Sequence, residues 1–177
     1  MNKSFKNYNK ITIIGICGSG KSTLAIKLSS TLKLPLIHCD KVYWKPFWKE
    51  PDDKEEFIKK IEAESTKDKW IIEGNYASCL DVRLKHSDLL IWLDYSRFAA
   101  FKGVFGRIIK NYGKVRPDMP ENCPEQIDLE FLKYIWNFPK NNTPKNEQIV
   151  SQYENKLDVL RFKNRRALKN YLAHCKS

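Results

Sequence analysis

Short apolar runs alternate with amphipathic segments along most of this 177-residue chain. The first clear run, residues 11–16, is rich in β-branched side chains and ends beside glycine, which predicts a buried strand. Similar short runs predict strands over residues 34–39, 70–72, 89–93 and 157–162. Apolar residues spaced for one helix face predict helices over residues 21–32, 52–68, 96–111, 130–138 and 165–175.

The order of these segments predicts the fold class. Strands that alternate with helices form βαβ units, so we expect an α/β fold in three layers, with a five-stranded parallel sheet between helices. The sequence holds no internal repeat and no linker, which predicts one domain over residues 1–177. Residues 112–124 contain three prolines and a glycine and predict an irregular loop, and a polar stretch over 139–144 follows the fourth helix.

Composition excludes several classes of protein. Aromatic residues make up 12% of the chain, which argues against disorder. No apolar run approaches the roughly 18–20 residues of a membrane-spanning helix. Five cysteines, an odd number without a C-x-x-C pair, argue against a disulfide framework and a zinc site. They predict reduced thiols and a cytoplasmic location. The three histidines form no constellation and receive no role.

The charge is unevenly distributed. The net charge is +11, of which +8 lies in residues 95–177. A basic half of this kind is typical of proteins that bind nucleic acid, a membrane surface or a small polyanion such as a nucleotide. Only seven of the 32 basic residues are arginines, and arginine is the side chain whose geometry suits phosphate, so the arginines are the stronger candidates for function.

Residues 15–22, G-I-C-G-S-G-K-S, match the phosphate-binding pattern G-x-x-x-x-G-K-[ST] between a predicted strand and a predicted helix. In that pattern, backbone N–H groups surround phosphate oxygens, the lysine reaches the β- and γ-phosphates, and the hydroxyl binds Mg²⁺. The helix N-terminus adds a favourable dipole. The sequence therefore predicts an ATP·Mg²⁺ site formed by Gly15, Cys17, Gly18, Ser19, Gly20, Lys21, Ser22 and Thr23.

A translation-type GTPase is excluded by what surrounds this loop. Residues 155–158 match the Asn-Lys-x-Asp base motif by letters, but they precede a predicted strand, and the chain has no Asp-x-x-Gly segment. The length of the chain and its flexible basic loop favour a small kinase instead.

Further motifs follow in a specific order: Asp40-x-x-x-Trp44-x-Pro46-x-Trp48, Trp70 to Tyr76 (W-I-I-E-G-N-Y), Arg116 to Met119 (R-P-D-M) and Cys123 to Glu125 (C-P-E). Together with the phosphate loop, this series resembles the DNA topology modulation protein family over about residues 10–138. Those proteins look like adenylate-kinase-type P-loop kinases. The resemblance implies that fold, a kinase-like activity and a link to DNA supercoiling. It also implies an ATP contact by Arg165, in the less diagnostic C-terminal part.

Asp40 closes the second predicted strand, near the phosphate loop. The resemblance to small-molecule kinases implies that an acid here contacts the acceptor hydroxyl or a water molecule of Mg²⁺. The simpler alternative is a helix N-cap or turn aspartate. Glu73, at the end of the third predicted strand, is the second candidate for the Mg²⁺ water shell, with a surface acid as its alternative.

Four further residues are acceptor-binding candidates: Trp44, Gly74, Asn75 and Arg83. Gly74 would let an acceptor approach the backbone closely. Arg83 would bind an acceptor anion or, alternatively, pair with Asp81 or Asp88. Four aromatic residues between 43 and 48 would stack a base or line an acceptor pocket, or else form a small core under the next helix. The aromatic stripe of Tyr134, Trp136 and Phe138 is predicted to belong to the core.

A short basic lid is predicted over about residues 112–125. Arg107 matches the basic position that, in adenylate-kinase-like lids, neutralises the transferring phosphate, and Arg116 lies in the proline-flanked loop. The nearby Lys102, Lys110 and Lys114 are more simply a solvated face.

These residues predict a phosphotransferase that moves the γ-phosphate of Mg·ATP to a small acceptor, with Lys21, Asp40, Arg107 and Arg116 as its catalytic residues. Ser22 would bind Mg²⁺ directly, and Asp40 or Glu73 through water. The alternative is a nucleotide-binding regulator associated with DNA. No helix-turn-helix, zinc finger or aromatic-basic RNA motif is present in the sequence, so nucleic acid is not the favoured partner.

Overall fold

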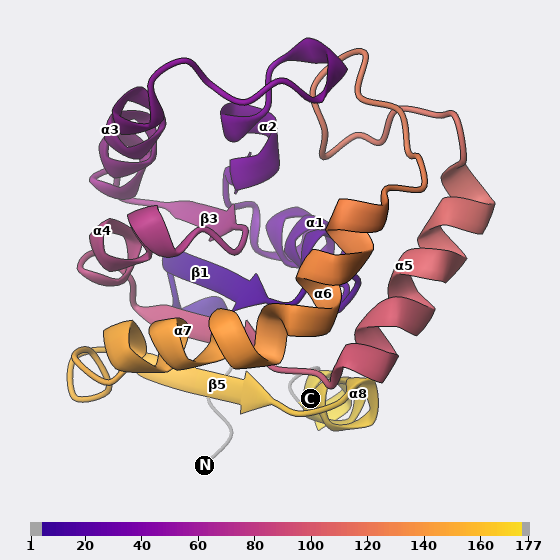
Figure 1. The fold of residues 1–177 in the computed structure, drawn as a ribbon. Helices are drawn as coiled ribbons and strands as arrows, with labels where there is room; N and C mark the ends of the chain where they lie inside the picture. The colour runs from indigo at the N-terminus through magenta and orange to yellow at the C-terminus, as the bar shows by residue number, and fades with distance from the viewer. Residues whose placement is uncertain (1–4, 175–177) are drawn as a thin grey trace.

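The computed structural model describes residues 5–174, and a sheet of five strands runs through its centre (Figure 1). The strands β1 (Lys10–Gly15), β2 (Leu36–His38), β3 (Trp70–Glu73), β4 (Leu89–Leu93) and β5 (Asp158–Phe162) are all paired in parallel, in the order β2-β3-β1-β4-β5. The parallel α/β fold predicted from the sequence is therefore confirmed.

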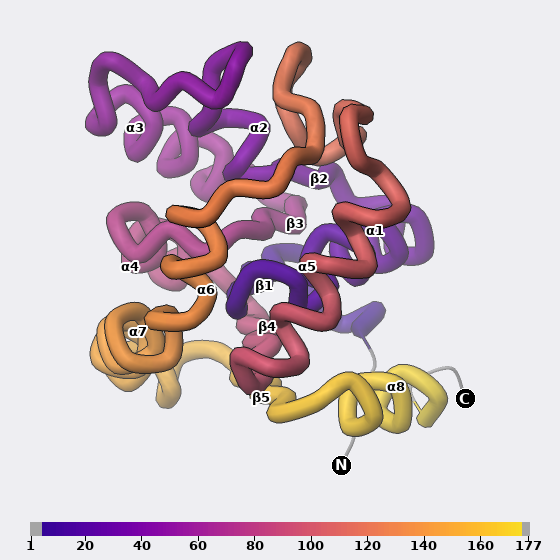
Figure 2. Tube along the Cα trace, turned by 45° about the vertical axis from the view of Figure 1, so that its right-hand side comes forward, coloured from indigo at the N-terminus to yellow at the C-terminus, as the bar shows by residue number. Residues whose placement is uncertain are grey.

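Eight α-helices among the described residues surround the sheet: α1 (Lys21–Leu32), α2 (Cys39–Tyr43), α3 (Lys54–Ser65), α4 (Leu80–Leu84), α5 (Arg97–Asn111), α6 (Leu129–Asn141), α7 (Thr143–Val150) and α8 (Arg165–His174). Three short 3₁₀ helices, η1 (Phe5–Asn7), η2 (Pro46–Trp48) and η3 (Ala77–Cys79), complete the elements. In Figure 2, α3, α4 and α7 lie on one side of the strands, and α1 and α8 on the other.

Alternation along the strands explains these two layers. Ile11 and Ile13 face a core built with α1, α5, α6 and α8, whereas Ile14 faces a second core with α4 and α7. A third cluster joins Phe57 and Ile61 of α3 to β3. Both faces of β1 and β4 are covered, which is why these strands are nearly uniform in apolar character.

The boundaries differ from the predictions at several places: the helix predicted over 52–68 is α3, Lys54–Ser65, and the short α2 was not predicted. The second strand ends at His38 because Cys39 already begins α2. The fourth predicted helix continues through Pro139 to Asn141 as α6, since a proline near the end of a helix interrupts only one turn. Helix α7 was not predicted; it begins with Thr143 and Pro144, and proline is well suited to the first turn of a helix.

The predicted C-terminal helix reaches His174 among the described residues, and Cys175 lies outside them. Between α5 and α6, residues 112–128 form an irregular segment with two isolated bridges, Tyr112 to Glu125 and Val115 to Pro124. No helix within residues 5–174 has the length and apolar character needed to cross a membrane.

Candidate active site

The phosphate-binding pattern forms a tight loop between β1 and α1. Gly15, Gly18 and Gly20 all have positive φ, at 145°, 80° and 96°, so the chain turns where other residues would be strained. Gly20 is also the N-cap of α1, which places the helix dipole at the loop. The Lys21 Nζ atom donates to the Ile16 carbonyl at 3.3 Å across the loop.

Helix α5 packs directly against this loop. A Cβ atom on Gly103 of α5 would lie 2.0 Å from the Gly18 carbonyl oxygen, and one on Gly18 would lie 2.3 Å from the Ala100 carbonyl oxygen. Arg165 at the start of α8 donates from Nη2 to the same Gly18 oxygen at 2.9 Å. The backbone of the loop is therefore held from α5 and α8, and the ATP contact predicted for Arg165 stays a prediction.

We expect Gly103→Ala to destabilise the fold by about 1–3 kcal/mol, the usual cost of overpacking, because its methyl group meets a main-chain oxygen that cannot rotate away. Gly106→Ala is the matched control on the same helix, since nothing lies within 4 Å of its added carbon. That control is expected to be neutral or stabilising by up to about 1 kcal/mol. Urea unfolding of both variants measures the difference, and equal stabilities would contradict the close packing.

Ser22, His38 and Glu73 meet at the carboxyl ends of β2 and β3. The Ser22 hydroxyl donates to Glu73 Oε1 at 3.0 Å, and His38 Nδ1 lies 2.7 Å from the same oxygen. Glu73 is only 2% exposed, so it is not a surface acid. His38, which received no role from the sequence, is its partner.

Asp118 of the 112–128 segment joins this group. Burial would raise the pKa of its carboxyl, but the Arg116 guanidinium and a hydrogen bond with Ser22 outweigh that effect and hold the pKa below its usual value. Ser22 thus lies among carboxylates from two separate parts of the chain. Within residues 5–174, however, no three His, Cys, Asp or Glu side chains converge as a metal-binding set.

Asp40 lies in the first turn of α2 rather than at the end of a strand, and His38 occupies the N-cap position. Its Oδ1 atom accepts a hydrogen bond from the Tyr76 hydroxyl at 2.7 Å. Burial and the nearby Glu73 charge raise the pKa of Asp40, although the Tyr76 hydrogen bond opposes that shift. The N-cap alternative is therefore wrong.

Arg107 and Arg116 both reach the carboxylate of Glu125, which is 5% exposed. Arg107 uses Nε and Nη2, at 3.0 and 2.8 Å from Oε1, and Arg116 Nε lies 2.8 Å from Oε2. Arg116 Nη1 also donates to Asp118 at 2.7 Å. These ion pairs leave Nη1 of Arg107 and Nη2 of Arg116 outside the contacts.

One cavity of about 590 Å³ connects these parts. Cys17 and Lys21 of the phosphate loop line it, together with Asp40, Arg107 and Arg116. Its remaining walls combine acidic and aromatic side chains, and the aromatic ones include Trp44 and Trp48 from the cluster that follows α2, and Phe131 and Tyr134 from α6. Tyr43 packs edge-on against Phe57 of α3, so part of the cluster is core and part faces the cavity.

The aromatic stripe on α6 is divided in the same way. Phe138 is buried, whereas Trp136 is 49% exposed and lies under the Arg97 guanidinium, whose centre is 4.8 Å from the ring. Tyr134 faces the cavity. The prediction that all three belong to the core is therefore wrong for Tyr134 and Trp136.

Residues 45–48 and 122–124 are joined along a seam beside the cavity, whose lining includes Trp48. Phe47 N donates to the Asn122 carbonyl at 3.1 Å, and the Trp48 indole donates to the Pro124 carbonyl at 3.1 Å. The Cys123 thiol accepts from Trp48 N and donates to the Lys45 carbonyl. The irregular segment is thus attached to the aromatic loop on the acceptor side.

The other predicted acceptor residues lie at different depths. Asn75 lines the cavity, but Arg83 is fully buried outside it and donates to the carbonyls of Gly74, Tyr76 and Cys79. The structure therefore does not bring Arg83 to the acceptor; it supports the turn that carries Asn75. Gly74 has a φ of 143°, and a Cβ there would lie 2.5 Å from Cys39 Cβ, so helix packing alone requires a glycine.

The fold resembles a solved structure of shikimate kinase from Acinetobacter baumannii in complex with shikimate. The TM-score is 0.60, with 12% identity over 97% of this chain and 93% of that chain. At this identity the similarity shows a P-loop kinase fold. No protein-family model and no curated protein sequence matches the chain. Membership of the DNA topology modulation family stays a prediction.

Proposed function

We propose that this protein is an ATP-dependent phosphotransferase acting on a small acceptor. The observation that carries the proposal is the shared cavity: the phosphate-loop lysine, the Asp40 carboxylate and two arginines all line one space of about 590 Å³. This volume lies within the roughly 300–1,000 Å³ of ordinary ligand sites. Phosphoryl transfer needs such an arrangement, because the protein contributes mainly positioning and charge.

In the proposed reaction, the phosphate loop and Lys21 hold ATP, and Arg165 steadies the loop from α8. Asp40 orients the acceptor hydroxyl and takes its proton as the oxygen attacks the terminal phosphorus. The bond between that phosphorus and the β,γ-bridging oxygen breaks, so ADP leaves and a phosphate ester forms. The proton then passes from Asp40 to solvent. Arg107 and Arg116 meet the charge on the transferring group with the nitrogens outside their ion pairs.

The residues around Ser22 fit a Mg²⁺ ion of the P-loop type. Such an ion takes one hydroxyl, one or two carboxylates and the substrate phosphates, and it keeps several waters. Ser22 would bind it directly, and Glu73 or Asp118 through water, since both lie beside the Ser22 hydroxyl. When bound, the ion neutralises charge on the β- and γ-phosphates. Asp40 would then serve the acceptor rather than the metal.

Two further expectations are part of the proposal. Residues 112–125 act as a lid within a single domain, because Arg116 and Glu125 line the same cavity as Lys21 of the phosphate loop. The location is cytoplasmic, which agrees with the free thiols of Cys17, Cys39, Cys79 and Cys123 among the described residues.

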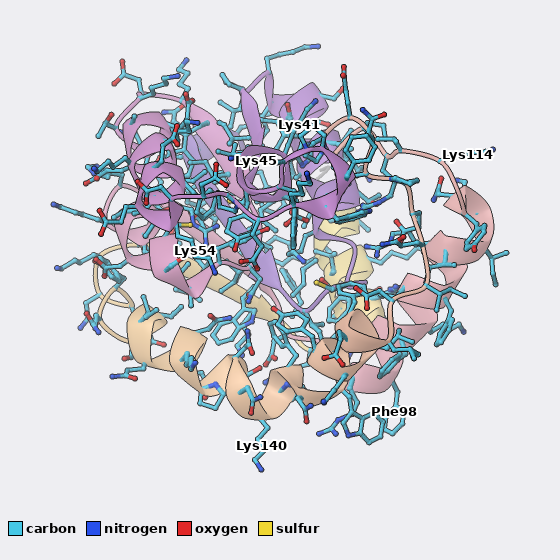
Figure 3. The ribbon with its side chains drawn as sticks, turned by 45° about the horizontal axis from the view of Figure 1, so that its top comes forward. Lys41, Lys45, Lys54, Phe98, Lys114 and Lys140 are labelled. Atoms are coloured by element: carbon cyan, nitrogen blue, oxygen red, sulfur yellow. The ribbon has the colours of Figure 1, made fainter. Side chains whose placement is uncertain are left out.

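The alternative, a nucleotide-binding regulator linked to DNA topology, rests on the charge of +8 in residues 95–177 and on the motif series. Lysines such as Lys114 and Lys140 project outward from this half of the chain (Figure 3). However, Arg107, Arg116 and Arg161 are each paired with carboxylates. A salt titration separates the two functions, because DNA affinity through 6–10 phosphates falls by roughly 10³–10⁵ between 50 and 200 mM salt.

Mg·ATP tests the proposal. At 100-fold over its Kd it should stabilise the fold by about 2.7 kcal/mol. For a chain of this size that corresponds to a rise in Tm of roughly 5–10 °C. Lys21→Ala should remove most of the rise, whereas Lys27→Ala, on an exposed face of the same helix, should keep it. An unchanged Tm of the native chain at saturating nucleotide would contradict the ATP site, and an ADP-release screen across small alcohols then identifies the acceptor.

A further inference from the structure

The acceptor part of the cavity is the space lined by Asp40, Asn75, the aromatic side chains, Arg107 and Arg116. Its cationic side chains do not outnumber the carboxylates that pair with them. Arg107 and Arg116 are matched by two buried carboxylates, Glu125 and Asp118, whose side chains are 4% and 7% exposed. Lys21 is the remaining cation of the lining, and it belongs to the phosphate loop. An acceptor that carries its own anion would find no unpaired positive charge in this part of the site. It would also meet the carboxylate of Asp40.

The charges of the whole lining also disfavour an anionic acceptor. Five carboxylates and three cationic side chains line the cavity. Glu50 is paired with Lys54 outside, at 3.0 Å, and Asp128 caps α6 by accepting from two backbone N–H groups. The exposed Glu130 adds negative charge, and Asp40 is stabilised by the charges of Lys21 and Arg116, so these two cations of the lining already face a carboxylate. Bringing an anion into such a site costs free energy through like-charge repulsion.

Aromatic side chains are the main apolar part of the cavity wall. Six aromatic residues line the cavity: Tyr43, Trp44, Trp48, Tyr76, Phe131 and Tyr134. Tyr43 lies between two of them, with ring centroids 5.2 Å from Trp44 and 4.9 Å from Tyr76. Rings of this kind stack on planar groups and bury large apolar areas. A planar ring in the ligand matches these walls better than a flexible chain or a sugar alone.

One polar group in the wall is set to select the ligand. Asn75 Oδ1 accepts from Asn146 of α7 at 3.0 Å, which fixes the orientation of the amide. Asn146 is itself 1% exposed. The Asn75 Nδ2 atom is buried and makes no hydrogen bond of normal geometry within the described residues, although the Asn75 side chain acts on the neighbouring Tyr134 hydroxyl and opposes the rise that burial causes in the pKa of Tyr134. A buried donor without a partner costs about 1–3 kcal/mol, so a ligand oxygen or ring nitrogen at this point would be favoured.

From these observations we infer that the acceptor is an uncharged planar-ring alcohol, of the class that includes nucleosides and hydroxymethyl-substituted heterocycles. The inference rests on the proposed function and specifies its substrate. The ring stacks between the aromatic walls, a ring oxygen or nitrogen accepts from Asn75 Nδ2, and the hydroxyl faces Asp40. The reaction is the transfer described above, with ATP as phosphoryl donor and the ring alcohol as nucleophile. Asn146 is a positioning residue for Asn75.

The test uses isosteric pairs, so that size does not confound charge. For each nucleoside or hydroxymethyl pyrimidine, a derivative with a carboxamide on the ring is compared with the matching derivative that has a carboxylate there. The reacting hydroxyl is the same in both. Isothermal titration is carried out on protein saturated with Mg²⁺ and a non-hydrolysable ATP analogue. We expect carboxamides to bind at least tenfold more tightly than carboxylates. Equal affinities, a preference for carboxylates, or no binding of any uncharged member at about 1 mM, the upper end of usual KM values, would overturn the inference.

Two variants separate charge and hydrogen bonding. Glu125→Gln removes the partner of both arginines, so the ratio between carboxamide and carboxylate should fall by tenfold or more. Asn75→Ala should weaken the uncharged ligand about tenfold, whereas Asn141→Ala, exposed at the end of α6, should not. If Glu125→Gln fails to fold, the Asn75 comparison still decides, and an unchanged affinity of Asn75→Ala contradicts the assigned contact.

The same titrations distinguish this inference from the function on which it rests. If the ATP analogue does not bind, the phosphotransferase proposal fails and the inference falls with it. If the analogue binds and carboxylates are preferred, the phosphotransferase stands and only the acceptor class is wrong.

Discussion

Replacing Arg107 or Arg116 by alanine is expected to lower kcat by ~10³ or more in at least one of the two variants, while the Kd for ATP changes by less than about tenfold in both. The transition state of phosphoryl transfer spreads negative charge over the equatorial oxygens, so a positioned arginine acts mainly there. Ground-state ATP is held by the loop N–H groups and Lys21. An interaction made only in the transition state raises kcat without tightening the ground-state complex.

The structure adds a cost in stability to Arg116→Ala. Arg116 is the partner of both Asp118 and Glu125, and its side chain is 14% exposed. Removing one member of a buried pair costs about 3–5 kcal/mol, so kcat is measured well below the Tm of the variant. Arg107→Ala leaves Arg116 on Glu125 and is the milder change. At least one of the two should show the loss of turnover.

A lysine at position 116 should restore the charge and only part of the turnover, since a point charge lacks the planar fork that contacts both carboxylates. Lys110→Ala, exposed on α5, is the control for a general loss of positive charge. Titration with the ATP analogue and steady-state turnover are measured on the same preparations. If both arginine variants turn over normally but lose DNA affinity in a salt-dependent way, Arg107 and Arg116 bind DNA rather than the transferring phosphate, and the DNA-binding alternative is supported.

Asp40→Asn is expected to reduce turnover by about 10²–10⁴, the usual contribution of a positioned general base. ATP binding should stay within tenfold, because the phosphate loop is untouched. The asparagine oxygen can still accept from the Tyr76 hydroxyl, so the geometry of α2 is kept and the missing property is basicity. Undiminished turnover on any identified acceptor would show that the carboxylate has no part in the reaction.

The pH profile provides a second readout for Asp40. Burial and Glu73 raise the pKa of this carboxyl, and the base must be deprotonated, so activity should fall on the acid side at a higher pH than an ordinary aspartate would give. Tyr76→Phe removes the hydrogen bond that lowers this pKa, so the acid limb should move to still higher pH. An acid limb that stays in place would mean that Asp40 is not the titrating group.

Local patterns predicted the phosphate loop and the sheet well, because both depend on neighbouring residues. The succession of strands and helices along the chain and the spacing from Gly15 to Ser22 follow from the sequence alone, whereas the order of the strands in the sheet was not predicted. Contacts between distant segments could not be predicted in this way. Glu125 pairs with Arg107 and Arg116, and Asp118 reaches Ser22 across 96 positions of sequence, through a loop whose path no periodicity describes.

Arg83 was predicted to bind the acceptor, and the structure does not support that role. An arginine beside a predicted site suggests an anion ligand, but this one satisfies main-chain carbonyls in a turn, a need that the sequence does not display. Asn146 was missed because it lies on α7, whose polar residues concealed a short helix. The spacing Arg116-x-Asp118 was the only available signal for the pairing of the arginines, and it gave no indication of Glu125.

The seam beside the cavity depends on two side chains more than on the backbone. Of its four hydrogen bonds, only the one from Phe47 N to the Asn122 carbonyl joins two main-chain atoms, and the other three use Cys123 Sγ or the Trp48 indole. Trp44 also lines the cavity but takes part in none of these four bonds. Substitutions of Trp44 can therefore alter which ligand fits while the seam is kept, whereas substitutions of Trp48 change the ligand pocket and the seam together. A change of substrate in this protein is expected to begin at position 44 rather than at position 48 or 123.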